Sequence, residues 1–118
     1  MNKETPLTEA VYYILLAVRE PNHGYGIIQD VFDMTDGRVN LGPGTLYGAI
    51  NSLLEKGWIK LYSEEKQSRK KKSYVITPLG VEVFKKEVIR LNELIKNGEK
   101  MGVWWCEKGT TRKSKTKD

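Results

Sequence analysis

The feature that most limits the possible folds of this chain is a pair of short segments rich in apolar side chains, separated by a highly charged stretch. In residues 73–77 the apolar Tyr74 and Ile76 recur two residues apart, and residues 58–63 combine apolar side chains with the polar Lys60 and Ser63. Alternation with a period of two is typical of strands. Because residues 64–72 between the segments are polar and charged, we predict a β-hairpin with a long basic tip.

Three helical segments are expected before this hairpin. Thr8 is suited to cap a helix in which apolar side chains recur at helical spacing over residues 11–18, although a strand is the alternative for this apolar run. A second helix is expected over about residues 25–34. A third is expected over residues 43–56, where apolar residues recur at i, i+4, i+7 and i+8 and Gly57 follows as the stop.

The remaining segments are a short extended piece at residues 39–41, one more helix and a tail. Thr77 and Pro78 have the residue types of an N-cap and a first helical position, and Gly98 after Asn97 offers a stop. Residues 101–118 are expected to form a largely disordered tail.

The expected last helix carries an apolar stripe. Its apolar residues are spaced 3, 4, 3 and 4, which is the seam of a coiled coil over about two heptads. We predict that it forms the contact of a homodimer, with packing on its own domain as the alternative. The stripe consists of Val81, Phe84, Val88, Leu91 and Ile95.

These elements predict a mainly α fold with a small β-hairpin, a winged helix-turn-helix followed by a C-terminal dimerisation helix. Residues 1–77 are predicted to be the DNA-binding domain, residues 78–100 the dimerisation helix and residues 101–118 the tail. The 118 residues suit one compact domain.

The net charge of +5 favours acidic partners such as nucleic acid or an anionic membrane surface. Residues 65–77 hold five basic and one acidic side chain, a net of +4, so the charge is concentrated there and at residues 101–118. The single Cys106 allows no internal disulfide, and the apolar run at residues 10–18 is too short to span a membrane. We therefore expect a cytoplasmic protein without a membrane partner.

The third expected helix has a polar face suited to the major groove of DNA. Its outward residues are Gly44, Gly48, Asn51, Ser52 and Glu55, with Thr45 and Tyr47 at the flanks. Glycines allow close approach, Asn51 can pair with adenine, and Thr45 can reach a base or a phosphate. The alternative is an ordinary amphipathic helix with a solvated outer face.

The hairpin tip supplies a second candidate contact with DNA. Cations here would bind the phosphate backbone and add affinity with little sequence information. A solvated loop is the alternative. The cations are Lys66, Arg69, Lys70, Lys71 and Lys72.

The sequence carries no pattern of an enzyme. His23 is the only histidine and Cys106 the only cysteine, so neither a metal cluster nor a Cys/His pair is expected, and no cofactor is predicted. His23 is interpreted as a loop residue, with a pH switch as the alternative.

Several short motifs resemble the PadR family of bacterial transcriptional regulators, in particular its short subfamily. The resemblance covers roughly residues 7–97 and is carried by Gly24–Tyr25–Gly26, Gly44–Thr45–Leu46–Tyr47, residues 53–59 and residues 72–80. It implies a winged-helix dimer that usually represses its target genes, with Tyr25 and Tyr47 near the DNA backbone.

The resemblance also implies a possible ligand site. Some short members bind planar aromatic drugs between subunits, on a tryptophan in the middle of the last helix. That helix has no tryptophan here, and Leu91 lies in its central region, while Trp104 and Trp105 follow the helix. Leu91, Trp104 and Trp105 are therefore candidates for binding a small aromatic effector, and packing against the dimer is the alternative for the two tryptophans.

The leading hypothesis is a repressor that binds an inverted-repeat DNA operator as a homodimer. One alternative is a sensor repressor that responds to a multidrug-type or phenolic ligand at the dimer interface. Another is a winged-helix protein-interaction module that does not bind DNA.

Overall fold

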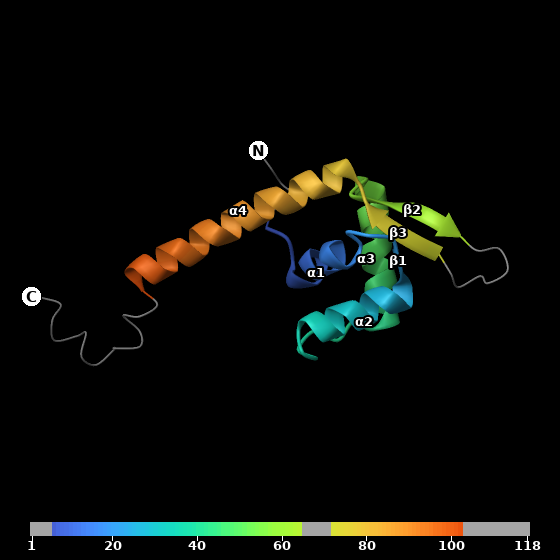
Figure 1. Ribbon diagram of the computed structural model, residues 1–118, viewed down its shortest axis with the longest axis horizontal. Coiled ribbons are helices and arrows are strands. Elements are labelled where there is room, and N and C mark those ends of the chain that lie inside the picture. Colours follow the sequence, from blue (N-terminus) through green and yellow to red (C-terminus); the bar gives the residue numbers. More distant parts are fainter. Residues whose placement is uncertain (1–5, 65–71, 103–118) are drawn as a thin grey trace, which may run out of the picture. The chain divides into compact units, whose positions relative to one another are not determined.

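The computed structural model describes residues 6–64 and 72–102. The chain divides into two compact units, residues 1–85 and residues 86–118, and the boundary falls inside the last helix. Figure 1 labels the helices and strands. In chain order they are α1 (Glu9–Ala17), β1 (Asn22–His23), α2 (Gly24–Met34), α3 (Pro43–Lys56), β2 (Ile59–Glu64), β3 (Lys72–Ile76) and α4 (Pro78–Met101).

The first two helices begin at side-chain caps. The Thr8 hydroxyl accepts a hydrogen bond from the Val11 backbone N–H at 3.2 Å, which confirms the predicted start of α1 and makes the strand alternative wrong. His23 caps α2 in the same way, because its Nδ1 accepts from the Gly26 N–H at 3.2 Å. The interpretation of His23 as a loop residue was therefore wrong, since it lies in β1 and caps a helix.

The boundaries of α3 agree with the prediction. Gly42 is the N-cap residue and Pro43 follows it at the start of the helix. Gly57 ends the helix with a φ of 78°, a left-handed conformation that glycine adopts without steric cost.

The sheet has three antiparallel strands in the order β1-β3-β2. The predicted hairpin is confirmed, with β2 and β3 each displaced by one residue from the expected bounds. Strand β1 was not predicted; it pairs Asn22 with Tyr74 and His23 with Ser73. The expected extended piece at residues 39–41 lies in neither a helix nor a strand.

The core of the first unit is formed by the inner sides of its helices and its sheet. Ile14 and Leu15 of α1 are buried with Ile27 and Val31 of α2. The predicted apolar stripe of α3 contributes buried side chains as well. Those side chains are Leu46, Ile50 and Leu53.

The end of α3 is bonded directly to the start of α4. The Thr77 hydroxyl donates to the Gly57 carbonyl at 2.6 Å, and the Thr77 N–H donates to the Trp58 carbonyl at 2.9 Å. The same hydroxyl accepts from the Gly80 N–H at 3.0 Å, which confirms Thr77 as the cap of α4. A Cβ on Gly80 would collide with the Trp58 carbonyl oxygen, so only glycine fits there. Below, this group is called the α3–α4 joint.

Helix α4 is longer than predicted. It continues to Met101, and the Gly102 N–H donates to the Gly98 carbonyl at 2.7 Å, so Gly98 does not stop the helix. A glycine inside a helix costs only about 1 kcal/mol relative to alanine, which a long helix tolerates. Met101, which was assigned to the tail, is thus the last residue of α4, and residues 103–118 lie outside the described part.

Each unit contains one ion pair among the described residues. The Arg38 guanidinium pairs with Glu9 and joins the segment after α2 to the start of α1. In α4, Arg90 pairs with Glu87 at 2.8 Å across one helical turn. In the described ranges, 6–64 and 72–102, no helix is both long and apolar enough to cross a membrane.

Candidate nucleic-acid interface

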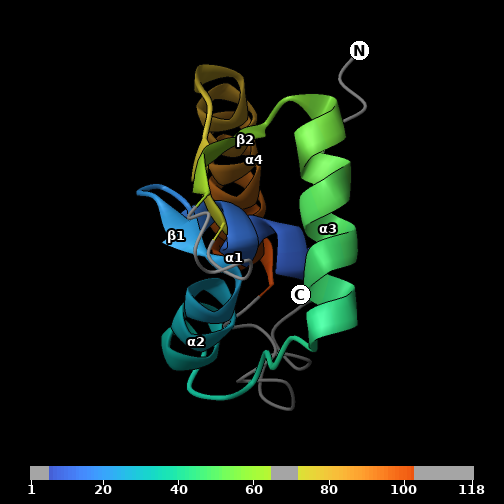
Figure 2. The same cartoon turned by 90° about the vertical axis from the view of Figure 1, so that its right-hand side faces the viewer.

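The predicted outer face of α3 is exposed in the structure. Gly44, Thr45, Gly48 and Asn51 all face solvent, as do Ser52 and Glu55, while the opposite side of the helix is buried in the core. Figure 2 shows α3 along its whole length at one side of the first unit, with no other element drawn in front of it. The helix therefore offers a polar surface with small residues at its N-terminal end.

The glycines on this face are not required by packing within the chain. A Cβ added at Gly44 or Gly48 would have no atom within 4 Å, and the same holds at Gly42. At the helix start, Gly42 supplies no side-chain cap, so the first backbone N–H groups have no side-chain acceptor from that residue. Free N–H groups at a helix start, together with the helix dipole, favour a phosphate.

Two tyrosines lie beside this face. Tyr25 is 70% exposed and Tyr47 is 44% exposed. A Cβ on Gly24 would collide with the Tyr47 hydroxyl, so the Tyr47 side chain lies directly against the start of α2, next to Tyr25 in the chain. The glycine makes room for this contact, which places Tyr47 against the residue that precedes Tyr25 in the chain.

The basic hairpin is described only in part. Lys72 is the first residue of β3 and is exposed. Lys60 on β2 is also an exposed cation of the hairpin, and it was not predicted as a DNA contact because it lies outside the charged tip. The other predicted hairpin cations, Lys66, Arg69, Lys70 and Lys71, lie outside the described residues.

The predicted seam of α4 has no single environment. Phe84 packs within its own chain, with its ring centroid 4.7 Å from that of Tyr12. Val81 and Ile95 are exposed, and Val88 and Leu91 are half-buried. Of the candidate ligand residues, only Leu91 is described, since Trp104 and Trp105 lie outside the described ranges.

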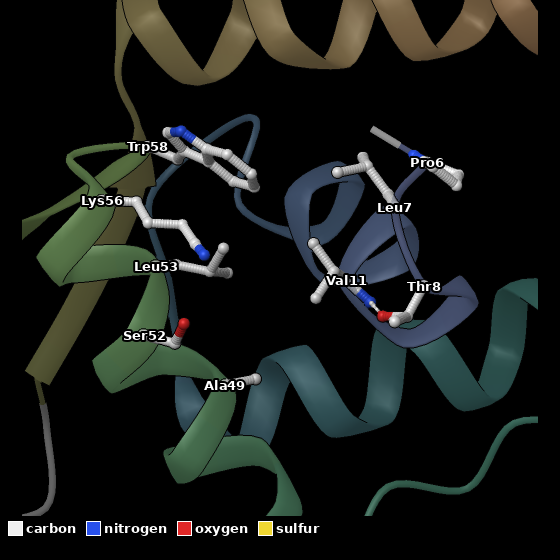
Figure 3. A pocket seen from close by; sticks show the side chains of 9 residues that line it. All are labelled: Pro6, Leu7, Thr8, Val11, Ala49, Ser52, Leu53, Lys56 and Trp58. Carbon is white, nitrogen blue, oxygen red and sulfur yellow. Dashed lines mark hydrogen bonds between the residues drawn. The ribbon is translucent and has the colours of Figure 1, made fainter. Parts of the chain in front are cut away.

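A cavity of about 210 Å³ lies on the flank of α3 away from Tyr47. Figure 3 shows the Lys56 and Trp58 side chains on one side of it and Leu7 with Val11 across from them. The Lys56 ammonium lies 5.3 Å from the centre of the Trp58 ring. This cavity was not predicted from the sequence. Its lining residues are Pro6, Leu7, Thr8, Val11, Ala49, Ser52, Leu53, Lys56 and Trp58.

Within the described part of the chain, no three His, Cys, Asp or Glu side chains are grouped so that they could hold a metal ion. The arrangement of α3 and the hairpin offers instead a polar surface with backbone donors, hydroxyls, an amide and cations. Such groups recognise base edges and phosphates.

Comparison with known proteins identifies the family. Residues 14–86 match the model of the transcriptional regulator PadR-like family. No curated protein sequence was found to be similar to the chain.

Solved structures share the fold. A transcriptional regulator from Clostridium thermocellum is 27% identical, with a TM-score of 0.66 over 79% of this chain and 91% of that one. A PadR family regulator from Eggerthella lenta is 23% identical, with a TM-score of 0.65 over 77% and 79%. BpsR from Bordetella bronchiseptica is 19% identical, with a TM-score of 0.62 over 87% and 71%. By its winged-helix fold and the family match over most of its described first unit, the chain belongs to the PadR-like family of transcriptional regulators, which bind DNA and are not enzymes.

Proposed function

We propose that this protein is a repressor that binds an inverted-repeat DNA operator as a homodimer. The observation that carries the proposal is the exposed N-terminal face of α3, where Gly44 and Gly48 leave the helix surface open. A recognition helix enters the major groove with its N-terminal residues against bases and phosphates. On this helix, those residues are small or polar.

Each part of the interface has a separate role in this proposal. The Asn51 amide reads adenine by donating one hydrogen bond to the base and accepting another from it. Thr45 binds a base edge or a phosphate. Tyr25 and Tyr47 contact the backbone from beside the helix. The hairpin cations, Lys72 among them, neutralise phosphates and add affinity without specificity.

The homodimer is supported by the apolar side chains that α4 exposes. Val81 and Ile95 reach solvent, and large exposed apolar side chains on one helix are typical of an interaction surface. With two-fold symmetry, two α3 helices meet one face of the duplex, so the half-sites are inverted and about 10 base pairs apart.

The experiment that tests the proposal is selection of bound duplexes from a random library at a stated salt concentration. The expected result is an enriched inverted repeat. If duplexes are bound without any enrichment, sequence readout by α3 is wrong. If no duplex is bound even at low salt, the chain is a protein-interaction module, and the DNA-binding proposal fails.

A second candidate function, regulation of the repressor by a small organic anion, is favoured by the cavity beside α3. Leu7, Val11 and Trp58 give it apolar walls, and Lys56 with Ser52 adds a cation and a hydroxyl. The Bordetella bronchiseptica structure concerns regulation of the DNA binding of BpsR by 6-hydroxynicotinic acid. A ligand in this cavity would touch the recognition helix itself.

Calorimetric titration with 6-hydroxynicotinate tests this second candidate. Lys56→Gln should abolish the binding heat, whereas Leu91→Ala should leave it unchanged. The opposite pattern would favour a site at the dimer interface that involves Leu91, Trp104 and Trp105. No heat with any of the three proteins would exclude this acid as the effector.

A further inference from the structure

The hairpin contains an irregularity in the pairing of β2 with β3, and none of the DNA contacts proposed so far involves it. Leu61 of β2 pairs with Tyr74 of β3, but the next pair is Ser63 with Ser73, so Tyr62 is an extra residue without a partner in the register. Such a β-bulge bends the strand and redirects a side chain. Bulges occur often beside functional sites.

The bulge coincides with two large exposed side chains in succession. Leu61 is 44% exposed and Tyr62 is 60% exposed. In a regular strand with one buried face, one of two consecutive side chains would be covered. The fold therefore leaves an aromatic ring and its hydroxyl in solvent on a strand that also carries the exposed cation Lys60.

The hairpin and α3 are presented on one side of the first unit. In Figure 1, β2 and β3 project to the right past α3. Figure 2 is viewed from that side, and α3 is again uncovered. A duplex that meets α3 from this side passes the hairpin as well.

We propose that Tyr62 is a DNA-contact residue, in which the hydroxyl donates a hydrogen bond to a phosphate oxygen and the ring packs on the neighbouring deoxyribose. This inference rests on the proposed DNA binding. Unlike a lysine, a tyrosine neutralises no phosphate and releases no counterion. Tyr62 therefore adds affinity that does not depend on salt, whereas the affinity from Lys60 and the other hairpin cations falls as salt rises.

The test measures binding of a fluorescent duplex of about 30 base pairs, long enough for two half-sites one helical turn apart, across a salt series. Tyr62→Phe should lose roughly tenfold in affinity, the value of one hydrogen bond to a charged acceptor. Tyr62→Ala should lose more, because the ring is also gone. In both variants the slope of log K against log salt should stay that of the wild type.

Two control variants separate this role from others on the same strand. Lys60→Ala should flatten the salt slope, and Leu61→Ala, which removes the other exposed apolar side chain, should leave DNA binding unchanged. Because Tyr62→Phe keeps the ring, it also reports on the hydroxyl where Tyr62→Ala fails to fold.

Three outcomes would contradict the inference or its basis. Unchanged affinity of both Tyr62 variants beside a wild type that binds DNA would overturn the assignment of Tyr62 alone. A loss of dimer with unchanged DNA affinity per dimer would overturn it in favour of a protein contact. A wild type that binds no duplex at any salt would instead refute the proposed function.

Discussion

Helices α3 and α4 are both amphipathic, but they use their apolar sides differently. In α3 the apolar side is buried in the core of its own unit, with Leu53 only 1% exposed. In α4 only Val83 and Phe84 join that core, and farther along Ile95 is 56% exposed. The same kind of sequence pattern is thus satisfied within the chain in one helix and left uncovered in the other.

This difference indicates which kind of partner each helix binds. An amphipathic helix with its apolar side buried turns its polar side outward, and for α3 that side carries groups that suit a polyanion. A helix with exposed apolar side chains lacks a cover, and burial of such side chains is worth about 25 cal/mol for each Å² removed from water. We therefore expect α3 to bind nucleic acid and α4 to bind a second copy of the chain.

The largest effect is expected from a charge in the α4 stripe. Leu91→Glu would place two like charges in a desolvated contact, at a cost of about 3 kcal/mol or more. Sedimentation at micromolar concentration should show monomers, and operator affinity should fall because one half-site is lost. A stable dimer with full operator binding would show that the interface lies elsewhere and that the comparison of the two helices is wrong.

The next effect compares one apolar truncation in each helix. Leu53→Ala should lower the free energy of unfolding by about 3 kcal/mol, because it leaves a cavity in the core. Ile95→Ala should change it by less than about 0.5 kcal/mol in the monomer, as at other exposed sites. Urea unfolding at protein concentrations below the dimer dissociation constant measures both changes in the free energy of unfolding. Equal losses in the two variants would contradict the contrast between α3 and α4.

A smaller effect is expected on the polar face of α3. Asn51→Ala should weaken operator binding by about 1–3 kcal/mol and leave non-specific binding nearly unchanged. Gly48→Leu should block entry into the groove by its bulk, although a side chain there meets nothing in the free protein. Competition between operator and random duplexes measures the ratio of specific to non-specific affinity. If both variants behave like the wild type, α3 does not read DNA in this orientation.

The hairpin lysines should contribute equally to the affinity for all duplexes, whatever their sequence. Replacing Lys70, Lys71 and Lys72 with alanine should flatten the slope of log K against log salt by about 0.9 for each lost phosphate contact. The matched control with the same change in net charge replaces three exposed lysines of α4, Lys85, Lys86 and Lys96. If the two triple variants have equal slopes, the hairpin acts through overall charge and not through contact.

The smallest effect concerns the ion pair in the first unit. The hydrogen bond from Arg38 lowers the pKa of Glu9, so the folded state favours the ionised carboxylate. This stabilisation is present above the ordinary pKa of glutamate and is lost as pH falls through the lowered value. Arg38→Gln should therefore be less stable than wild type at neutral pH and similar to it in acid, with thermal unfolding across pH as the measurement. A difference that persists in acid would assign the loss to packing of Arg38.

The sequence predicted best where a local signal marks a boundary. Pro43 and Gly57 bracket α3, and Thr8 and Thr77 are caps that the structure confirms. The face of α3 followed from helical spacing, since each inward position holds an aliphatic residue. Exposure at the candidate site was predictable for the same reason.

Features that depend on distant partners were not predictable. Strand β1 is two residues long, which is too short for any periodicity, and its partner β3 lies some fifty residues away in the chain. Gly98 looked like a stop because local propensity cannot weigh one glycine against the long helix that precedes it. The closeness of Tyr47 to Gly24 likewise depends on the packing of α2 against α3.

The α3–α4 joint has a mechanical consequence. Gly57, Thr77 and Gly80 are held together by hydrogen bonds and by a glycine that admits no side chain. These contacts fix the end of α3 against the first turn of α4, so a substitution at one side of the joint is expected to affect the other. A methyl group at residue 80 would collide with the Trp58 carbonyl oxygen and disturb this junction, while every residue on the exposed face of α3 kept its identity.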